Sequence, residues 1–308
     1  MKARTYAILG LLGGVIFGRF AIRHRTHTQM ILGFGNRQAW RWFNEQFPCF
    51  VEAHSGLEVI RDKVFVRMVN PTHWVDYLIF GLGRVCVEDL EQILNLCGNG
   101  FGIGALQMLR GMYERQVTAA YLSNHLEEAD AFVEYDYIHT RKLVSQFKQV
   151  YKDAPEILNG IVSEQDQVEI EENYTKVKPK FQKTKCETCQ TTEDMFSWTK
   201  LDLGSMALKS QQPALKDMYP YSYFMPLLMG HSTFKSVEAR VVFREDGSFS
   251  FESEGQQKAI KRALVLSHHL FLHVLDLQNK HFKLGLEKAL NQCEKDYLVC
   301  WNSKDESD

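Results

Sequence analysis

An arginine and a glutamate four positions apart, Arg110 and Glu114, are the residues whose types and spacing first suggest chemistry. They lie within residues 104–122, where many apolar side chains at helical spacing predict a helix that packs in a core. An exposed pair of this kind contributes only about 0.3–0.5 kcal/mol, which is too little to explain its place on an apolar face. A buried pair needs further polar partners, and we expect Tyr223 and His231 to supply them.

Two interpretations of this polar centre are open. In the first, the four side chains form a satisfied network that fixes the register of the helices. In the second, they line a ligand or catalytic pocket, where Arg110 holds an anion and Glu114 or His231 moves protons. A third arrangement, in which the pair is simply exposed, is also consistent with the sequence.

A second candidate pairs Arg262 with His268, or alternatively with His269. Their spacing is similar to the Arg-x(4–6)-His signature of helical ribonucleases of the HEPN group, which use the histidine as acid or base and the arginine to stabilise phosphate charge. The signature has little specificity, because Arg19 with His24 and Arg67 with His73 also match it. A metal-independent ribonuclease is therefore the alternative function, and the sequence leaves open whether the protein is an enzyme.

Two groups of residues have ligand types that suit a metal. His269, His273 and Asp276 fall on one face of a predicted helix, and two histidines with a carboxylate can bind zinc or iron. Their neighbours are apolar, however, which favours an ordinary core position. Cys186 and Cys189 form a lone CxxC, which is half of a zinc site and is better explained by exposed loop thiols. We expect no required cofactor, although a zinc ion is possible.

A hydrophobic segment at residues 5–22 precedes these groups. It has an uncharged run from Thr5 to Gly18, followed by Arg19, and predicts an N-terminal membrane-anchor helix within residues 1–25. A signal peptide is disfavoured by the poor cleavage site, and an amphipathic transit peptide by the continuous apolar run. Positive charge is heavier after the run, so we expect lipid contact here and the bulk of the chain on the cytoplasmic side.

Three features of composition narrow the choice of partners. Gly10, Gly14 and Gly18 make a stripe of small residues that would allow two anchor helices to pair as a homodimer. The net charge of −2 argues against nucleic acid as a partner. Seven scattered cysteines are no disulfide framework and favour a reducing compartment.

The rest of the chain predicts a mainly α fold, a multi-helix bundle with one small β-hairpin. Apolar periodicity and helix start and stop signals predict helices at residues 73–96, 101–124, 127–152, 256–279 and 281–301. Alternation around Glu245-Asp246-Gly247 predicts the hairpin. The expected organisation is an anchor (1–25), a juxtamembrane aromatic and basic helix with a linker (26–70), a helical domain (71–302) with a polar insertion (153–198) and the hairpin (237–253), and a disordered tail (303–308).

Several of these residues also carry a resemblance that covers about residues 90–275. The motifs are Arg110-xxx-Glu114 with Tyr121, then Tyr135 and Tyr137, residues 198–207, Tyr219-xxx-Tyr223 and His231-Ser232. They resemble an uncharacterised, largely bacterial helical family, domain of unknown function fifty-six seventy-seven. That family often has a serine before the histidine, whereas this chain has residues 227–230, Leu-Leu-Met-Gly, there.

The resemblance implies a helical bundle and supplies no reaction. The expected function is therefore that of a membrane-tethered, cytoplasmic binding module with a polar centre formed by Arg110, Glu114, Tyr223 and His231. Its small-molecule ligand, if it has one, is unknown.

Overall fold

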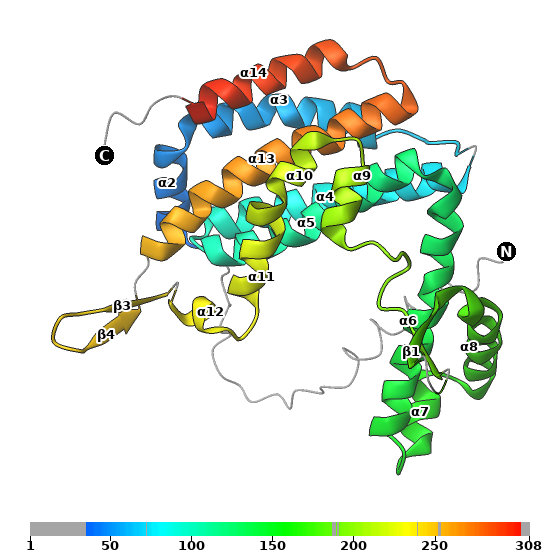
Figure 1. Cartoon of the computed structure of the whole chain (residues 1–308). Helices are drawn as coiled ribbons and strands as arrows, with labels where there is room; N and C mark the ends of the chain where they lie inside the picture. The colour runs from blue at the N-terminus through cyan, green and yellow to red at the C-terminus, as the bar shows by residue number, and fades with distance from the viewer. Residues whose placement is uncertain are drawn as a thin grey trace, which may run out of the picture. The chain divides into compact units, whose positions relative to one another are not determined.

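The computed structural model describes residues 35–302, apart from Thr72, Glu187, Thr188, Gln190, Ala239, Glu252 and Ser253, and it leaves the side chains of Cys186, Glu254 and Gln256 undescribed. Within these residues the chain is mainly helical and has two two-stranded antiparallel hairpins (Figure 1). The described residues fall into two compact units, one formed by residues 130–200 and the other by the remainder. The prediction of a mainly α bundle is confirmed.

The larger unit is a bundle built on three long helices that pack against one another, α4 (Trp74–Gly98), α5 (Gly102–Asn124) and α13 (Glu254–Phe282). Two further helices, α3 (Pro48–Phe65) and α14 (Glu287–Asn302), pack together and against α13 (Figure 1). The smaller elements are α2 (Arg37–Gln46), η1 (Leu126–Glu128), α9 (Leu203–Lys209), α10 (Pro213–Tyr219), η3 (Pro220–Phe224), α11 (Met225–Gly230) and α12 (Phe234–Glu238).

Helix α5 lies at the centre of this bundle because it is apolar on several sides. Leu106, Leu109, Met112 and Val117 are all 1% exposed or less. The neighbouring helices approach closely where small residues permit it. At Gly98 the ring of Trp40 occupies the place that a side chain would need, so α2 rests directly on the end of α4.

Helix α2 falls in the segment that was predicted to be a juxtamembrane helix. Phe43 is buried, its ring lies 5.5 Å from that of Trp40, and α2 packs on α4, so this helix belongs to the bundle. The expected linker after it is wrong, because α3 fills most of that stretch. The predicted anchor (1–25), the stripe of Gly10, Gly14 and Gly18, and the predicted tail (303–308) lie outside the described residues. Within residues 35–302, no helix combines the length and the apolar character that a bilayer crossing requires.

The predicted hairpin is present as β3 (Val241–Phe243) and β4 (Phe249–Phe251), with Gly247 in its turn at a φ of 80°. Phe243 lies opposite Phe249, and Val241 lies opposite Phe251, so one face of the hairpin carries these four apolar side chains. Its three phenyl rings are 61–71% exposed.

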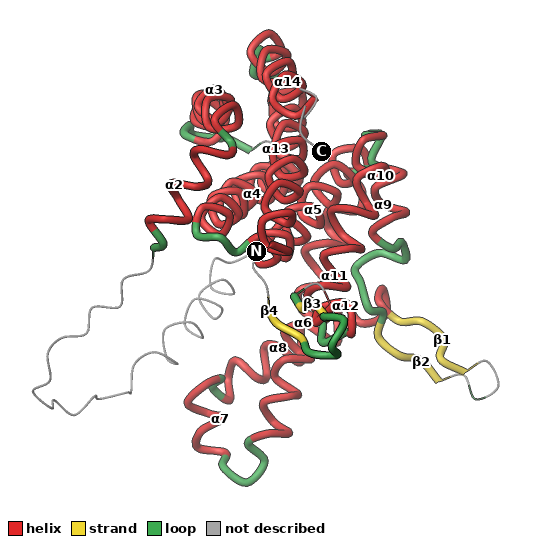
Figure 2. Tube along the Cα trace, turned by 90° about the vertical axis from the view of Figure 1, so that its left-hand side faces the viewer, coloured by secondary structure: helices red, strands yellow, loops and turns green. Residues whose placement is uncertain are grey.

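The smaller unit contains α6 (Ala129–Val150), α7 (Pro155–Ile161), α8 (Glu164–Val177), η2 (Lys178–Phe181), β1 (Gln182–Cys186) and β2 (Thr191–Asp194). Its core joins Tyr135 and Ile138 of α6 to Tyr174 of α8 and to Phe181. The sequence predicted a polar insertion with its thiols on an exposed loop, and the structure instead has the hairpin β1–β2 there (yellow in Figure 2). This hairpin is stabilised by polar cross-strand pairs, such as Lys183 Nζ with Glu193 Oε1 at 3.0 Å, rather than by apolar alternation.

Candidate functional site

Three of the four residues predicted to form a polar centre meet on the surface of the bundle. Arg110 Nε donates to Glu114 Oε1 at 2.8 Å, and Arg110 Cζ lies 5.1 Å from the centre of the Tyr223 ring. The side chains of Arg110 and Glu114 are 31% and 41% exposed. The expectation of a buried pair is therefore wrong, and the group is a half-exposed one that solvent and ligands can reach.

A π-helical turn positions the tyrosine. Segment η3 connects α10 to α11, and within it the Met225 N–H bonds to the Pro220 carbonyl, five residues back. Pro226 has no N–H to give to the Ser222 carbonyl, and its ring would crowd that oxygen in an α-helix. A wider turn relieves this conflict, so the chain stays helical through both prolines.

The widened turn stacks Tyr219 on Tyr223 and packs both rings against Tyr113. The rings of Tyr219 and Tyr223 lie 5.3 Å apart with an interplanar angle of 25°. Beneath them Tyr113 of α5 is fully buried, and its hydroxyl donates to the Leu215 carbonyl at 2.5 Å. Burial raises the pKa of the Tyr113 hydroxyl well above its usual value, so this group stays protonated. We call Arg110, Glu114, Tyr219 and Tyr223 the tyrosine cluster.

The fourth predicted residue, His231, is elsewhere. It follows α11, is exposed, and contributes its backbone N–H to the Leu227 carbonyl at 3.2 Å. No contact joins its ring to Arg110 or Glu114 among the residues that the structure describes. The geometry gives no support to a proton-transfer role for His231 beside this pair.

The sequence missed a second ion pair on the same helix. Arg115 Nη1 donates to Asp89 Oδ2 at 2.8 Å, which joins α5 to α4. The Asp89 side chain is only 4% exposed, and this burial raises the pKa of its carboxyl to about 6 against the attraction of Arg115. The one available signal was an aspartate set among the apolar residues Val87 and Leu90.

The alternative pair, Arg262 and His268, is not brought together. His268 is 1% exposed, its Nδ1 accepts a hydrogen bond from Trp301 Nε1 at 3.2 Å, and the ring of Phe50 lies 5.6 Å away. Burial lowers the pKa of His268 to about 4, which keeps the ring neutral at pH 7. Arg262 is exposed, and no contact links it to His268 within the described part of the chain.

The predicted metal ligands have other partners. His269 Nε2 and His273 Nε2 face each other at 3.2 Å, and Asp276 accepts from Lys280 Nζ at 2.7 Å. Among the described residues, no group of three or more histidine, cysteine or acidic side chains could hold a metal ion. Cys189 Sγ lies 3.2 Å from Thr191 Oγ1. The Cys186 side chain is outside the described part, so the CxxC prediction stays a prediction.

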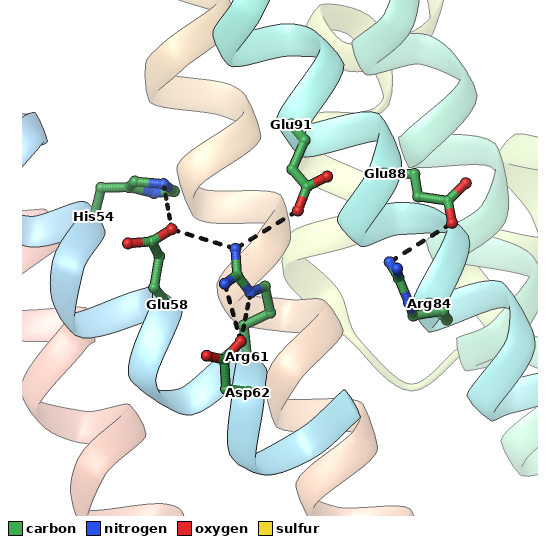
Figure 3. A network of polar contacts seen from close by, with 7 residues as sticks. All are labelled: His54, Glu58, Arg61, Asp62, Arg84, Glu88 and Glu91. Atoms are coloured by element: carbon green, nitrogen blue, oxygen red, sulfur yellow. Dashed lines mark hydrogen bonds and ion pairs between the residues drawn. The ribbon is translucent and has the colours of Figure 1, made fainter. Parts of the chain in front are cut away.

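A more extended charge network lies on α3 and α4 (Figure 3). Arg61 reaches Asp62 at 2.9 Å and Glu91 at 3.6 Å, so it bridges the two helices.

On α4, Arg84 and Glu88 form an i, i+4 pair at 3.7 Å with about half of each side chain exposed. That pair has the spacing of Arg110 and Glu114 but no ring contact, so it serves as a matched reference for the tyrosine cluster. The residues drawn are His54, Glu58, Arg61, Asp62, Arg84, Glu88 and Glu91.

Residues 76–249 match the model of a family of unknown function (DUF5677), over more than half of the 308 residues. The chain belongs to this family. The resemblance stated from the motifs is thereby confirmed, and DUF5677 brings no known reaction with it. The matched region contains the tyrosine cluster and the Asp89–Arg115 pair, whereas Arg262 and His268 lie outside it. The comparisons with curated proteins and with solved structures found no match.

Proposed function

We propose that this protein is a binding module and that the tyrosine cluster is its recognition surface. The observation that carries this proposal is the half-exposed guanidinium of Arg110, which is held by a carboxylate on one side and by the Tyr223 ring on the other. An isolated surface pair leaves a long side chain mobile, whereas two partners restrict it. Restricting a side chain before binding lowers the entropy cost of binding.

The chemistry of the cluster favours a partner rich in hydrogen-bond acceptors. Arg110 uses one of its five N–H donors on Glu114, and its other four have no acceptor among the described residues. A carboxylate, a phosphate or backbone carbonyls could accept them. Glu114 offsets the positive charge, so the surface would select by hydrogen-bond geometry and ring stacking more than by net charge.

Site-specific photo-crosslinking in cells tests this proposal. Gln107 is exposed and lies three residues before Arg110 on α5, so a photoreactive residue placed there would report contact with the same face. We expect a defined crosslinked partner that is lost in Arg110→Ala and retained in Arg84→Ala, the matched reference. Unchanged crosslinking in Arg110→Ala would contradict the proposal.

We propose further that residues 1–25 attach this module to a membrane, with the larger part of the chain on the cytoplasmic side. The uncharged run from Thr5 to Gly18 and the excess of positive charge after it support this arrangement. Carbonate extraction of the full-length chain is the test. Release of the protein into the soluble fraction would contradict the anchor and leave the binding surface unaffected.

The alternative proposal, a ribonuclease using Arg262 and His268, has weaker support because the His268 ring is buried under Trp301 and Phe50. RNA cleavage by the purified protein that is abolished in Arg262→Ala would favour the ribonuclease over the binding module.

A further inference from the structure

Helices α3 and α14 pack side by side in an antiparallel register that can be read from one close contact (Figure 1). Cys293 Sγ of α14 lies 3.5 Å from the position that a Cβ on Gly56 of α3 would take. Seven residues are about two helical turns, so seven steps backward on α3 and seven forward on α14 keep the same face. Those steps lead to Cys49 and Cys300.

The surrounding rings confirm this register at the far end of the pair. Trp301 follows Cys300, and its ring lies 6.4 Å from that of Phe47 and 5.8 Å from that of Phe50, which stand two residues before and one residue after Cys49. The same register brings Cys300 next to Cys49, and Cys49 is one of the groups that raise the pKa of the Cys300 thiol. The helix register therefore places the two thiols opposite each other across the helix pair.

This thiol pair is the most accessible of those on the bundle. Cys49 is exposed and Cys300 is half-buried, whereas Cys86, Cys97 and Cys293 are buried. Burial, together with the neighbouring Cys49 thiol, raises the pKa of Cys300 to about 12, so this residue is a poor first nucleophile at neutral pH. An oxidant arriving from solvent meets Cys49 first.

We propose that Cys49 and Cys300 are a modification site where a hydroperoxide forms a reversible disulfide, fastening the start of α3 to the end of α14. Cys49 sulfur attacks one peroxide oxygen, an S–O bond forms as the O–O bond breaks, and Cys49 becomes a sulfenic acid while the first water leaves. Cys300 sulfur then attacks Cys49 sulfur, the S–S bond forms, and the S–O bond breaks. The leaving hydroxide takes the Cys300 proton as the second water. Two thiols lose two electrons, and one hydrogen peroxide gains them.

The disulfide would stabilise the part of the core around His268, which only aromatic rings cover in the reduced protein. Trp301 donates to His268 and covers that buried imidazole, and Trp301 sits next to Cys300. A covalent link at position 300 would hold Trp301 in this place. Because the bond closes a loop of most of the chain, it would also remove a large share of the unfolded chain's entropy. The oxidised protein should therefore unfold at a higher temperature than the reduced one.

The test uses the full-length protein, reduced and then treated with hydrogen peroxide as the oxidant. After free thiols are blocked, peptide mapping should find a Cys49–Cys300 crosslink in the monomer. The unfolding temperature should rise by about 5 °C or more and return to its starting value with dithiothreitol. Cys49→Ser, a change at an exposed position, should lose both effects.

Two controls separate this pair from the other thiols. Cys189→Ser removes an exposed thiol of the smaller unit and should leave the crosslink and the temperature rise intact. Cys300→Ser should lose both, and if this variant is unstable, Cys49→Ser still gives the answer. Oxidised wild-type protein without a Cys49–Cys300 peptide, or a rise in unfolding temperature that survives in Cys49→Ser, would overturn the proposal.

Discussion

Helix α5 carries two arginine–carboxylate pairs that have the same 2.8 Å separation and different surroundings. Arg110 and Glu114 lie within one helix and are both about a third exposed or more. Arg115 reaches across to Asp89, whose carboxylate is buried in α4. Equal distances therefore conceal unequal energies, because an exposed pair is screened by water whereas a buried carboxylate depends on its partner.

This difference in burial gives the two pairs different roles: the Arg110 pair is available to a partner, and the Arg115 pair joins two helices of the bundle. The Arg110 guanidinium has donors to offer and a ring that fixes it, so a partner can replace water there. Asp89 has no such freedom, since losing Arg115 would leave a charge in the core. The same is true of two histidines of α13, His268, which is buried, and His273, which is half-buried: loss of water around both rings lowers their pKa to about 4.

The largest expected effect is the loss of the partner of Asp89. Arg115→Met should lower the free energy of unfolding by about 3 kcal/mol at pH 7, because the buried Asp89 carboxyl loses its partner and must either stay charged in the core or take up a proton. At pH 5, below the pKa of about 6, Asp89 takes up a proton and the loss should shrink. Urea unfolding at both pH values measures this. An equal loss of unfolding free energy in Arg110→Met would show that the two pairs contribute equally to stability.

The next largest effect is a loss of unfolding free energy at low pH, caused by His268 and His273. The pKa values of His268 and His273 are lowered to about 4, below the value of about 6.5 in an unfolded chain. The unfolded state therefore binds more protons between these values, and stability is lost as the pH falls from about 6.5 towards 4. For His268 the contribution is on the order of 3 kcal/mol, and protonation of Asp89 offsets part of the loss over the same range.

Comparing unfolding free energies of the wild type and His268→Phe at pH 7 and pH 4.5 isolates this contribution. The phenyl ring keeps the packing against Phe50 and Trp301 but cannot take up a proton. The variant should lose less stability on acidification than the wild type. Parallel losses in the two proteins would show that His268 is not part of the acid response.

A smaller effect should couple Arg110 to Tyr223. A double-mutant cycle with Arg110→Met and Tyr223→Leu should give an interaction free energy of about 0.5–1 kcal/mol, the usual size of a cation–π contact at a partly exposed site. The same cycle between Arg84→Met and Tyr223→Leu should give none. Additive effects for Arg110 and Tyr223 would mean that the ring does not hold the guanidinium.

The smallest effect belongs to the exposed carboxylates. Glu114→Gln should cost about 0.3–0.5 kcal/mol, and 1 M salt should remove most of this difference. Glu88→Gln, in the matched pair on α4, should cost the same. A cost of several kcal/mol for Glu114→Gln would mean that the Arg110–Glu114 pair stabilises the fold as the buried Arg115–Asp89 pair does.

Sequence patterns predicted the long helices well because their periodicity extends over many turns. Helix α4 was expected at residues 73–96 and runs over Trp74–Gly98. The hairpin β1–β2 was missed because its strands are held by lysine, glutamate and threonine pairs that look like a polar loop. Local chemistry could not show which strands pair when so few of their side chains are apolar.

The site was predicted in part for a similar reason. Arg110 and Glu114 share one helix, so their spacing reveals the contact. The bond from Arg115 to Asp89 joins two helices across 26 residues, and nothing in the local spacing of either residue reveals it. His231 was expected to join the centre as a further polar partner of a buried pair, but the helix ends at Gly230 and the chain leaves the cluster there.

The π turn at η3 makes the tyrosine cluster sensitive to the length of the chain as well as to its residues. Each residue of an α-helix adds about 100° of rotation, so a turn with one extra residue sets the phase of everything that follows. Removing a single residue between Tyr219 and Tyr223 would change the rotation between these two positions by about 100° and turn one tyrosine away from the other. A homologue shorter by that one codon could retain Arg110, Glu114 and both tyrosines and still lack the arrangement, and its loss would not show in a residue-by-residue comparison.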